Sequence, residues 1–376
     1  MSVHRAADRW KVRWREPDGK ERAKRFDLKR DASSFATRVR RELDVGSYQT
    51  RTEFELHAKR QREATVRAVA RRWLELESVR LKPTTVVAYE SIIEGHIEAA
   101  FGTTPVSQLD ARDVQQFVAG LTSGGRQPRT VRNVVNVLRP VLELAVSEGL
   151  VDKNPADGVR LPPPRTTASE RMVFAPAEEL IRLATELGRT YSPLVLFAAF
   201  VGLRAGELHA LRVGDVDSSR GRVTIRRSVE EVRGRLVEGT PKNGRERTVG
   251  VPPEVLAALS PRLLERSSRD LVFTTDSGGQ IRHSNFYRRH YRPAVVRCST
   301  ASDLPKDFRF HDLRHSCAAL LIAEGAHPRA IMERLGHSSI SVTLDTYGHL
   351  FPSIDESLTA ALDTTIRAAL EGIEAA

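Results

Sequence analysis

Apolar and basic residues alternate at the start of the chain, a pattern typical of a half-buried strand. The apolar positions are Trp10, Val12 and Trp14. Pro17-Asp18-Gly19 then supplies a turn, and a second strand from Glu21 to Phe26 completes a hairpin. From Asp31 the apolar period lengthens to four residues and predicts a helix that ends at Gly46. Residues 1–60 are therefore expected to form a small α+β domain.

Helical spacing dominates from residue 61 to residue 155. One face of the first predicted helix carries Val66, Val69, Trp73 and Leu76. Pro83 begins a second helix, and Asp110 is placed to cap a third. A long helix then runs from Thr130 to a stop at Gly149, with a potential kink at Pro140. This segment is predicted to be an all-α domain.

Proline, glycine and asparagine interrupt the helical pattern between Asp152 and Ser169. The segment contains Asn154-Pro155, Asp157-Gly158 and Pro162-Pro163-Pro164. Such a composition resists packing and is typical of an interdomain linker. We therefore expect a linker at residues 156–170 and the main domain boundary within it.

Residues 171–352 are predicted to form a mostly helical domain with a small sheet. The strand candidates are Arg222 to Val229, Arg235 to Glu238 and Arg247 to Val251. A turn, Pro241-Lys242-Asn243-Gly244, separates the last two. A helix at residues 353–376 follows, with an apolar stripe of Leu358, Leu362, Ile366, Leu370 and Ile373. The fold class is thus multidomain: a small α+β domain, an all-α domain and a mostly α, mixed α+β domain.

The charge of the chain indicates a polyanionic partner. The 376 residues carry a net charge of +11, and residues 1–72 hold 21 Lys and Arg against 11 Asp and Glu. An excess of this kind favours a polyanion such as DNA, because cations that neutralise phosphates release counterions. A solvated basic surface that only keeps the protein soluble is the alternative.

Several functional classes lack sequence support. The apolar run Leu194 to Val201 is too short to span a bilayer, and no signal-peptide pattern opens the chain, so we expect a cytoplasmic protein. Cys298 and Cys317 lack the spacing of a zinc or redox motif. Neither GxGxxG nor GxxxxGK[ST] occurs, so a nucleotide cofactor is not indicated.

Three short clusters, far apart in the chain, carry the polar residues of most chemical interest. They are Gly202-Leu203-Arg204-Ala205-Gly206-Glu207-Leu208, His311-Asp312-Leu313-Arg314-His315 and Leu335-Gly336-His337-Ser338-Ser339, with Tyr347 ten residues after His337. Taken singly, they could be a surface arginine, a polar helix face and a core tyrosine. The histidines could also form a metal site, but no acidic or cysteine partner stands at suitable spacing.

In this order and spacing the clusters resemble the tyrosine recombinase (phage integrase) family. The resemblance covers at least residues 175–350, including apolar or glycine positions at Leu320, Gly325 and Ile331. The domain order is also similar to that of phage integrases. It implies an arm-type DNA-binding domain at 1–60, a helical, SAM-like core-binding domain at 61–155 and a catalytic domain at 171–352.

The resemblance implies a role for each of six residues. Arg204 and Arg314 hold the two non-bridging oxygens of a DNA phosphate, which planar guanidinium groups do with paired hydrogen bonds. Tyr347 is the nucleophile, and His311 could accept its proton, since a tyrosine hydroxyl has a pKa of about 10. His337 donates a hydrogen bond to the phosphate, and Lys242, in its hairpin turn, protonates the leaving 5′-oxygen. Glu207 is expected to support Arg204.

The implied reaction needs no metal or nucleotide cofactor. Tyr347 forms a 3′-phosphotyrosyl link, and two rounds of strand exchange pass through a four-way junction in a homotetramer on DNA. The implied partners are double-stranded DNA at core and arm attachment sites, and a host DNA-bending or directionality factor. The helix at 353–376, which has five acidic residues against Arg367, is expected to contact a neighbouring protomer or its own catalytic domain.

Other functions stay open from sequence. A chromosome or plasmid dimer resolvase of the same family would share the six residues, although the arm-like domain favours integration and excision of a phage or mobile element. A relaxing topoisomerase of related chemistry would reseal the same strand. A catalytically inactive DNA-binding accessory protein is the alternative from another class.

Overall fold

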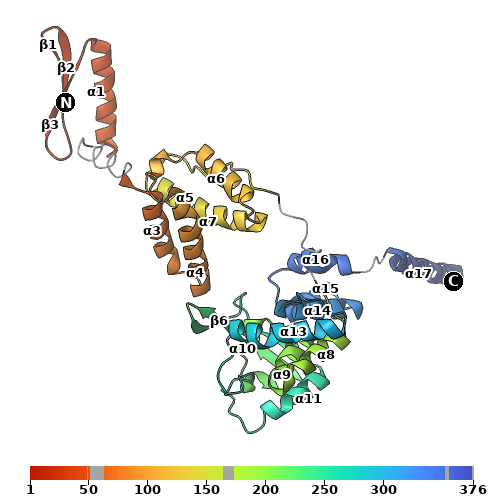
Figure 1. Cartoon of the computed structure of the whole chain (residues 1–376). Coiled ribbons are helices and arrows are strands. Elements are labelled where there is room, and N and C mark those ends of the chain that lie inside the picture. The colour runs from red at the N-terminus through yellow and green to blue at the C-terminus, as the bar shows by residue number, and fades with distance from the viewer. Residues whose placement is uncertain (49, 51–62, 164–172, 352–354, 375–376) are drawn as a thin grey trace. The chain divides into compact units, whose positions relative to one another are not determined.

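The computed structural model describes residues 1–48, 50, 63–163, 173–351 and 355–374. The chain divides into two compact units, residues 1–164 and 165–376 (Figure 1). The expected boundaries at residues 60, 170 and 352 lie outside the described residues. The fold is mixed α and β, as predicted, with a small N-terminal sheet, a helical region and a mostly helical C-terminal unit. No helix in the described ranges is long and apolar enough to cross a membrane.

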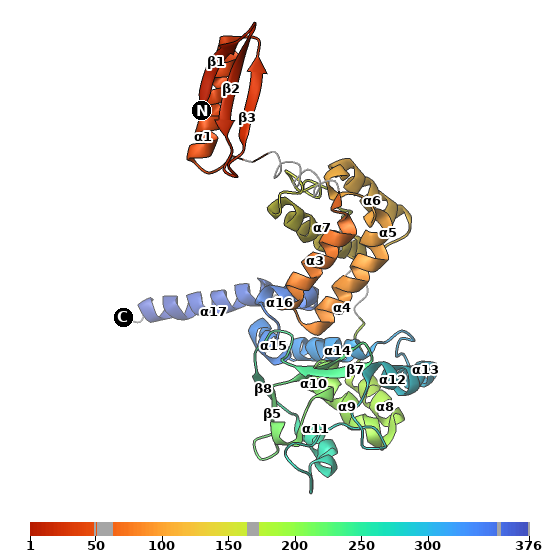
Figure 2. The same cartoon turned by 90° about the vertical axis from the view of Figure 1, so that its left-hand side faces the viewer.

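The N-terminal domain is a three-stranded antiparallel sheet with one helix against it (Figure 2). Its elements are β1 (Ser2–Ala6), β2 (Arg9–Arg15), β3 (Glu21–Phe26) and α1 (Lys29–Asp44). Val12, Ala32 and Ala36 form its buried core, surrounded by Trp10, Trp14, Phe26 and Phe35. Strand β1 was not predicted, because an edge strand with four exposed side chains shows no apolar alternation.

The alternation on β2 sends its basic residues to the face of the sheet opposite α1. In the strand register, Lys11 stands opposite His4 and Arg25, and Arg13 stands opposite Ser2 and Ala23. Lys11, Arg13 and Arg25 therefore share one face of the sheet. We call these three residues the basic face.

The helical region packs its helices mainly around one apolar core. The elements are α3 (Val66–Ser78), α4 (Pro83–Ile92), η1 (Ile93–Ile97), α5 (Glu98–Phe101), η2 (Val106–Gln108), α6 (Ala111–Ser123) and α7 (Pro128–Ser147). Asp110 caps α6 as predicted, and a reciprocal bond from the Asp110 amide to Asp113 completes a capping box. The long α7 supplies much of the core, including Val134, Leu138 and Leu142, all fully buried.

The first half of the expected linker packs against this helical region, which corrects the prediction for residues 156–163. Ala156 is fully buried in its core, and Asn154 donates hydrogen bonds to the Arg139 carbonyl and to Glu143. In return, Arg139 and Arg132 donate to the carbonyl oxygens of Ala156 and Pro162. Side-chain donors on α7 thus satisfy a proline-rich backbone that cannot form regular structure.

The C-terminal unit surrounds its core with helices and carries two small sheets. Its first helices are α8 (Ala177–Glu186), α9 (Gly188–Phe200) and α10 (Ala205–His209), then η4 (Val213–Asp215). Strands β4 (Val216–Asp217), β5 (Arg222–Ile225) and β8 (Arg247–Gly250) form one antiparallel sheet, and β6 (Ser228–Val232) pairs with β7 (Arg235–Gly239). After these come α11 (Pro253–Leu259), η5 (Ser260–Arg262), α12 (His283–Phe286), η6 (Tyr287–Tyr291) and α13 (Arg292–Ala301).

The last helices of this unit carry most of the conspicuous motif residues. They are α14 (Phe310–Ala323), α15 (Pro328–Leu335), α16 (Ile340–Tyr347), η7 (Gly348–Leu350) and α17 (Asp355–Glu374). Helix α14 packs against α9, and α15 packs against both α16 and β8. The three clusters far apart in sequence are brought to one region by these contacts.

The predicted strand Arg222 to Val229 is wrong as a single element. It splits into β5 and β6, which belong to different sheets. Arg226 and Arg227 stand at the break, and both donate to the buried carboxylate of Asp215, at 2.9 and 2.7 Å. Because adjacent side chains of a strand point to opposite faces, two neighbours can reach one carboxylate only where the strand is interrupted.

Candidate active site

Gly202 allows the first cluster, Gly202 to Leu208, to pack closely against α14 and α15. Its φ of +80° lies in the left-handed region, and a Cβ there would stand 2.7 Å from Leu335 Cδ2. The tight approach lets the Gly202 carbonyl accept a hydrogen bond of 2.6 Å from Arg314 Nη1. Arg204, two residues further on, is the N-cap of α10.

Glu207 is the buried acid of the site, with 1% of its surface exposed. Its oxygens accept from the Arg204 amide and Nη1, at 2.9 and 3.1 Å, and from Arg247 Nη1 and Nη2, at 2.9 and 2.7 Å. Burial alone would raise the pKa of this carboxyl, but Arg247 and then Arg204 lower it to about 2. Glu207 supports Arg204, as predicted, and is ionised at neutral pH.

Arg314 lies beneath the site and is only 3% exposed. Its second terminal nitrogen, Nη2, donates to the Leu335 carbonyl at 2.5 Å, so α14 is tied to the ends of both α9 and α15. Burial and the neighbouring charge of Arg204 lower the pKa of Arg314 to about 9, which still leaves it protonated at neutral pH. The guanidinium is therefore a fixed, buried positive charge.

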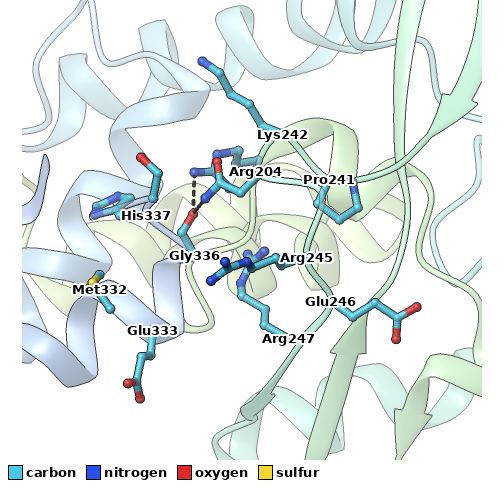
Figure 3. Close-up of a pocket in the computed structure, with 12 residues that line it drawn as sticks. Arg204, Pro241, Lys242, Arg245, Glu246, Arg247, Met332, Glu333, Gly336 and His337 are labelled. Carbon is cyan, nitrogen blue, oxygen red and sulfur yellow. Dashed lines mark hydrogen bonds between the residues drawn. The ribbon is translucent and has the colours of Figure 1, made fainter. Parts of the chain in front are cut away.

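The Gly336 carbonyl joins the turn between β7 and β8 to the third cluster. This turn does not close the predicted hairpin, because β7 pairs with β6 and β8 pairs with β5. It accepts from Arg204 Nη2 at 3.1 Å and from Asn243 Nδ2 at 2.5 Å (Figure 3). Gly336 ends α15 in the left-handed conformation, with φ +66°, and turns the chain toward His337. Lys242, next to Asn243 in the β7–β8 turn, is thereby held on one side of the pocket, with His337 on the helical side.

A pocket of about 570 Å³ opens over this arrangement. Its lining includes five basic residues, Arg204, Lys242, Arg245, Arg247 and His337, and two acidic ones, Glu246 and Glu333. Such an excess of cations in a concave site attracts anions. Three of the six residues predicted from sequence, Arg204, Lys242 and His337, line this pocket.

Two histidines hold α16 through residues one helical turn apart. His337 Nδ1 lies 2.8 Å from Thr343 Oγ1, and His315 Nδ1 lies 2.8 Å from Tyr347 Oη. Thr343 and Tyr347 are buried, with 0% and 1% of their surfaces exposed. Burial raises the pKa of Tyr347 to about 12, against the opposing charge of Arg314, so the hydroxyl is protonated at neutral pH. Burial and the charge of Arg314 lower the pKa of His337 to about 3.

The structure places His311 one helical turn from His315, with ring centroids 4.8 Å apart. His315 ends the second cluster but is not among the six residues given a role from sequence, and it is the histidine that contacts Tyr347. Thr343, Asn243 and Arg247 were also missed. The i, i+4 spacing of Thr343 and Tyr347 on one helix was an available signal, whereas nothing in the sequence brings Asn243 or Arg247 to Gly336 or Glu207. Within the described residues, no group of three or more His, Cys, Asp and Glu could hold a metal ion.

Comparisons with known proteins agree with the motifs. The profile of the Phage integrase family matches residues 171–353, and that of the phage integrase N-terminal SAM-like domain matches residues 65–122. The ICEBs1 integrase of Bacillus subtilis is 31% identical over 75% of this chain and 78% of its own length. The integrase of Mycobacterium phage L5 is 28% identical over 90% of this chain and 89% of its own length.

Solved integrase structures share the fold. The integrase of transposon Tn1549, in complex with circular intermediate DNA, has a TM-score of 0.64 at 18% identity and covers 80% of this chain and 99% of its own. A lambda integrase tetramer bound to a Holliday junction has a TM-score of 0.59 at 17% identity, over 90% of this chain and 96% of the lambda chain.

The fold and these similarities define a site-specific DNA recombinase. The chain belongs to the phage integrase family, whose members are also called tyrosine recombinases.

Replacing Glu207 by glutamine should destabilise the C-terminal unit, because Arg204 and Arg247 would lose their shared counter-charge. The expected loss is about 3 kcal/mol of unfolding free energy at pH 7, as is typical when a buried ion pair is broken. The folded-state pKa of Glu207 is lowered from 4.5, so its carboxylate stabilises the fold above that pH and loses this effect as the pH falls toward 2. In urea unfolding, the difference in unfolding free energy between wild type and variant should therefore become smaller as the pH falls.

Glu246→Gln is the matched control, since Glu246 lines the same pocket but is 63% exposed. This control should change the unfolding free energy by less than about 1 kcal/mol. Equal stability of the two variants would contradict the role given to Glu207. So would a difference in unfolding free energy between wild type and Glu207→Gln that stays constant with pH.

Proposed function

We propose that this recombinase cleaves and rejoins DNA through Tyr347, and that it integrates and excises a phage or another mobile element. The observation that carries the proposal is the convergence of Arg204, Arg314 and His337 around the Gly336 turn. The charges of both arginines act on the Tyr347 hydroxyl. Such an arrangement suits a nucleophile that attacks a bound phosphate.

The two arginines retain donors for a DNA phosphate. A guanidinium has five N–H groups, and the hydrogen bonds described above use two on each arginine. Their remaining donors would bind the non-bridging oxygens, whose charge grows in the transition state. Thr343, by donating to His337 Nδ1, would leave His337 Nε2–H as a further donor to the phosphate.

The cleavage step moves two protons. The Tyr347 oxygen forms a bond to phosphorus as the bond from phosphorus to the 5′-oxygen breaks, which leaves a 3′-phosphotyrosyl link. Lys242 donates a proton to the leaving 5′-oxygen, and a histidine of α14 takes the proton of Tyr347, a step that the family motif assigns to His311. In the second step a 5′-hydroxyl from the partner duplex attacks the phosphotyrosyl link. Repetition on the other strands proceeds through a four-way junction.

Integration and excision are favoured over dimer resolution by the N-terminal domain. The integrase of Mycobacterium phage L5, similar over 90% of this chain, is that of a phage. The basic face of Lys11, Arg13 and Arg25 gathers three cations on one side of the sheet, which suits contact with DNA phosphates, and small sheets are known to enter DNA grooves. We assign residues 1–60 to arm-site binding, residues 61–155 to the core site and residues 171–352 to catalysis.

Helix α17 is proposed to link protomers in a tetramer, the assembly reported for lambda integrase on a Holliday junction. Leu362, Ile366 and Leu370 lie along one side of it and are 63%, 56% and 55% exposed. The side chains of Leu358 and Ile373 lie outside the described residues. An apolar stripe of this kind suits a groove on a neighbouring protomer. A DNA-bending or directionality factor of the host would act on the same complex.

Tyr347→Phe should bind DNA as well as wild type and form no covalent complex, because the substitution removes only the hydroxyl. The test is a nicked suicide duplex that carries the core site. The core site is taken from the DNA that flanks the coding region. An integrated element is recognised there by two copies of a short core sequence. Denaturant-resistant adducts formed by the Phe variant would place the nucleophile elsewhere.

Lys242→Ala should slow cleavage by about 10²-fold or more, as expected from the loss of a general acid. A substrate with a 5′-bridging sulfur should restore the rate, because a thiolate leaves without being protonated. Lys306→Ala, which removes an exposed lysine elsewhere in the unit, is the control and should cleave both substrates at the wild-type rate. A Lys242→Ala defect that sulfur leaves unchanged would remove Lys242 from the proton transfer.

Two truncations, each a control for the other, test the domain assignments. Deletion of residues 1–60 should abolish high-affinity arm binding and flatten its salt dependence, while a bare core site is still cleaved. Deletion of residues 356–376 should weaken synapsis far more than DNA binding or thermal stability. Unchanged arm affinity would contradict the first assignment. A tail truncation that unfolds the monomer, or one that still assembles normally, would contradict the second.

A further inference from the structure

The hydrogen bond between Tyr347 and His315 has no counterpart in the six-residue motif. The phenol oxygen lies 2.8 Å from His315 Nδ1, and the two rings meet edge to face with centroids 5.7 Å apart. Oxygen and nitrogen at this separation are already in position for proton transfer, with no bridging water required. His315 therefore contacts the reacting atom itself.

His311 is less well placed for this proton. It meets His315 edge to face, with centroids 4.8 Å apart, and among the described residues the histidine hydrogen-bonded to Tyr347 is His315. On α14 it stands one turn before His315, nearer the N-terminal end of the helix. His315 thus lies next to Tyr347, and His311 lies next to His315.

The position of Tyr347 is fixed from a second point on the same helix. Thr343, one turn earlier on α16, is held by His337 at 2.8 Å and is fully buried. With both residues anchored, α16 presents the Tyr347 hydroxyl to α14 in one orientation. The contact with His315 is therefore part of the buried packing of α16 and is not a chance surface contact.

We propose that His315, through Nδ1, is the general base that takes the proton of Tyr347 during cleavage and returns it during rejoining. This inference rests on the proposed role of Tyr347 as the nucleophile. It assigns a catalytic function to a histidine that the family motif leaves out.

The charges around His315 suit this role. Burial lowers its pKa, Asp312 opposes that effect, and Arg314 and Arg309 add to it. The other titratable groups that face it are His311 on α14, Tyr347 on α16 and His337 before α16. His315 is thus neutral near pH 7, and its Nδ1 lone pair can accept the hydrogen of a phenol that burial keeps protonated.

The proton balance closes over the whole reaction. As the Tyr347 oxygen bonds to phosphorus, its O–H bond breaks and His315 becomes an imidazolium, while Lys242 protonates the departing 5′-oxygen. When a 5′-hydroxyl attacks the phosphotyrosyl link, the tyrosine oxygen leaves and regains its proton from His315. Lys242 takes up the proton of the attacking hydroxyl, so both groups return to their starting states.

The test compares His315→Asn with His311→Asn in the full-length protein. An asparagine side chain places an amide atom near the position of Nδ1, so it can hold Tyr347 by a hydrogen bond but cannot take up its proton. Single-turnover cleavage is measured from pH 6 to pH 9.5 on a suicide duplex with a 5′-bridging sulfur, which removes the need for Lys242. Thermal melting and DNA binding confirm that each variant is folded, and His315→Gln replaces His315→Asn if the latter unfolds.

For His315→Asn we expect a rate about 10²–10⁴-fold below wild type at pH 7, the usual contribution of a general base. Its rate should rise about tenfold per pH unit up to pH 9.5, because hydroxide must then ionise a tyrosine whose pKa is about 12. The wild type and His311→Asn should instead reach a plateau above the pKa of His315.

Two outcomes would overturn the proposal. A steep profile for His311→Asn with a wild-type profile for His315→Asn would assign the proton to His311. A slow His315→Asn that keeps the wild-type plateau would make His315 a positioning residue only. Failure of the proposed nucleophile is a separate result, since Tyr347→Phe would then still form a covalent adduct.

Discussion

The buried carboxylate of Glu207 is the constraint on which the geometry of the site depends. It receives four hydrogen bonds, from Arg204 at the start of α10 and from Arg247 on β8. An ionised carboxylate that is 1% exposed is tolerated only with such partners, so the α10 turn and the sheet must stay together. Arg204 also donates to the Gly336 carbonyl, and Arg247 donates to the Arg334 carbonyl. These bonds fix the end of α15 as well.

Backbone carbonyls, and no further acids, accept most of the remaining hydrogen bonds of the central arginines. Arg314 donates to Gly202 and Leu335, and Arg334 donates to Phe200 and Gly250. A carbonyl oxygen satisfies an N–H group without neutralising its charge, so the site keeps a strong positive potential around Glu207. That excess suits a DNA phosphate, and the same contacts fix the turn that carries His337.

Sequence reasoning predicted the domain types, the Asp110 cap and the pairing of Arg204 with Glu207, because each depends on local periodicity or short spacing. It missed β1, whose pairing comes from backbone contacts, and it joined β5 to β6, whose break depends on the buried Asp215. Residues 156–163 pack because α7 supplies donors for their carbonyls, a contact invisible in a proline-rich composition. The role of His315 was missed for a similar reason. Its contact with Tyr347, 32 residues away in the chain, depends on how α16 packs against α14.

The central claim is that one buried phenol on α16 carries the DNA strand during exchange. The most direct test isolates the covalent adduct formed on a nicked core site, digests it with nuclease and protease, and maps the modified residue by tandem mass spectrometry. The account predicts a nucleotide joined through its 3′-phosphate to Tyr347. A nucleotide on any other residue, or one attached through a 5′-phosphate, would contradict it.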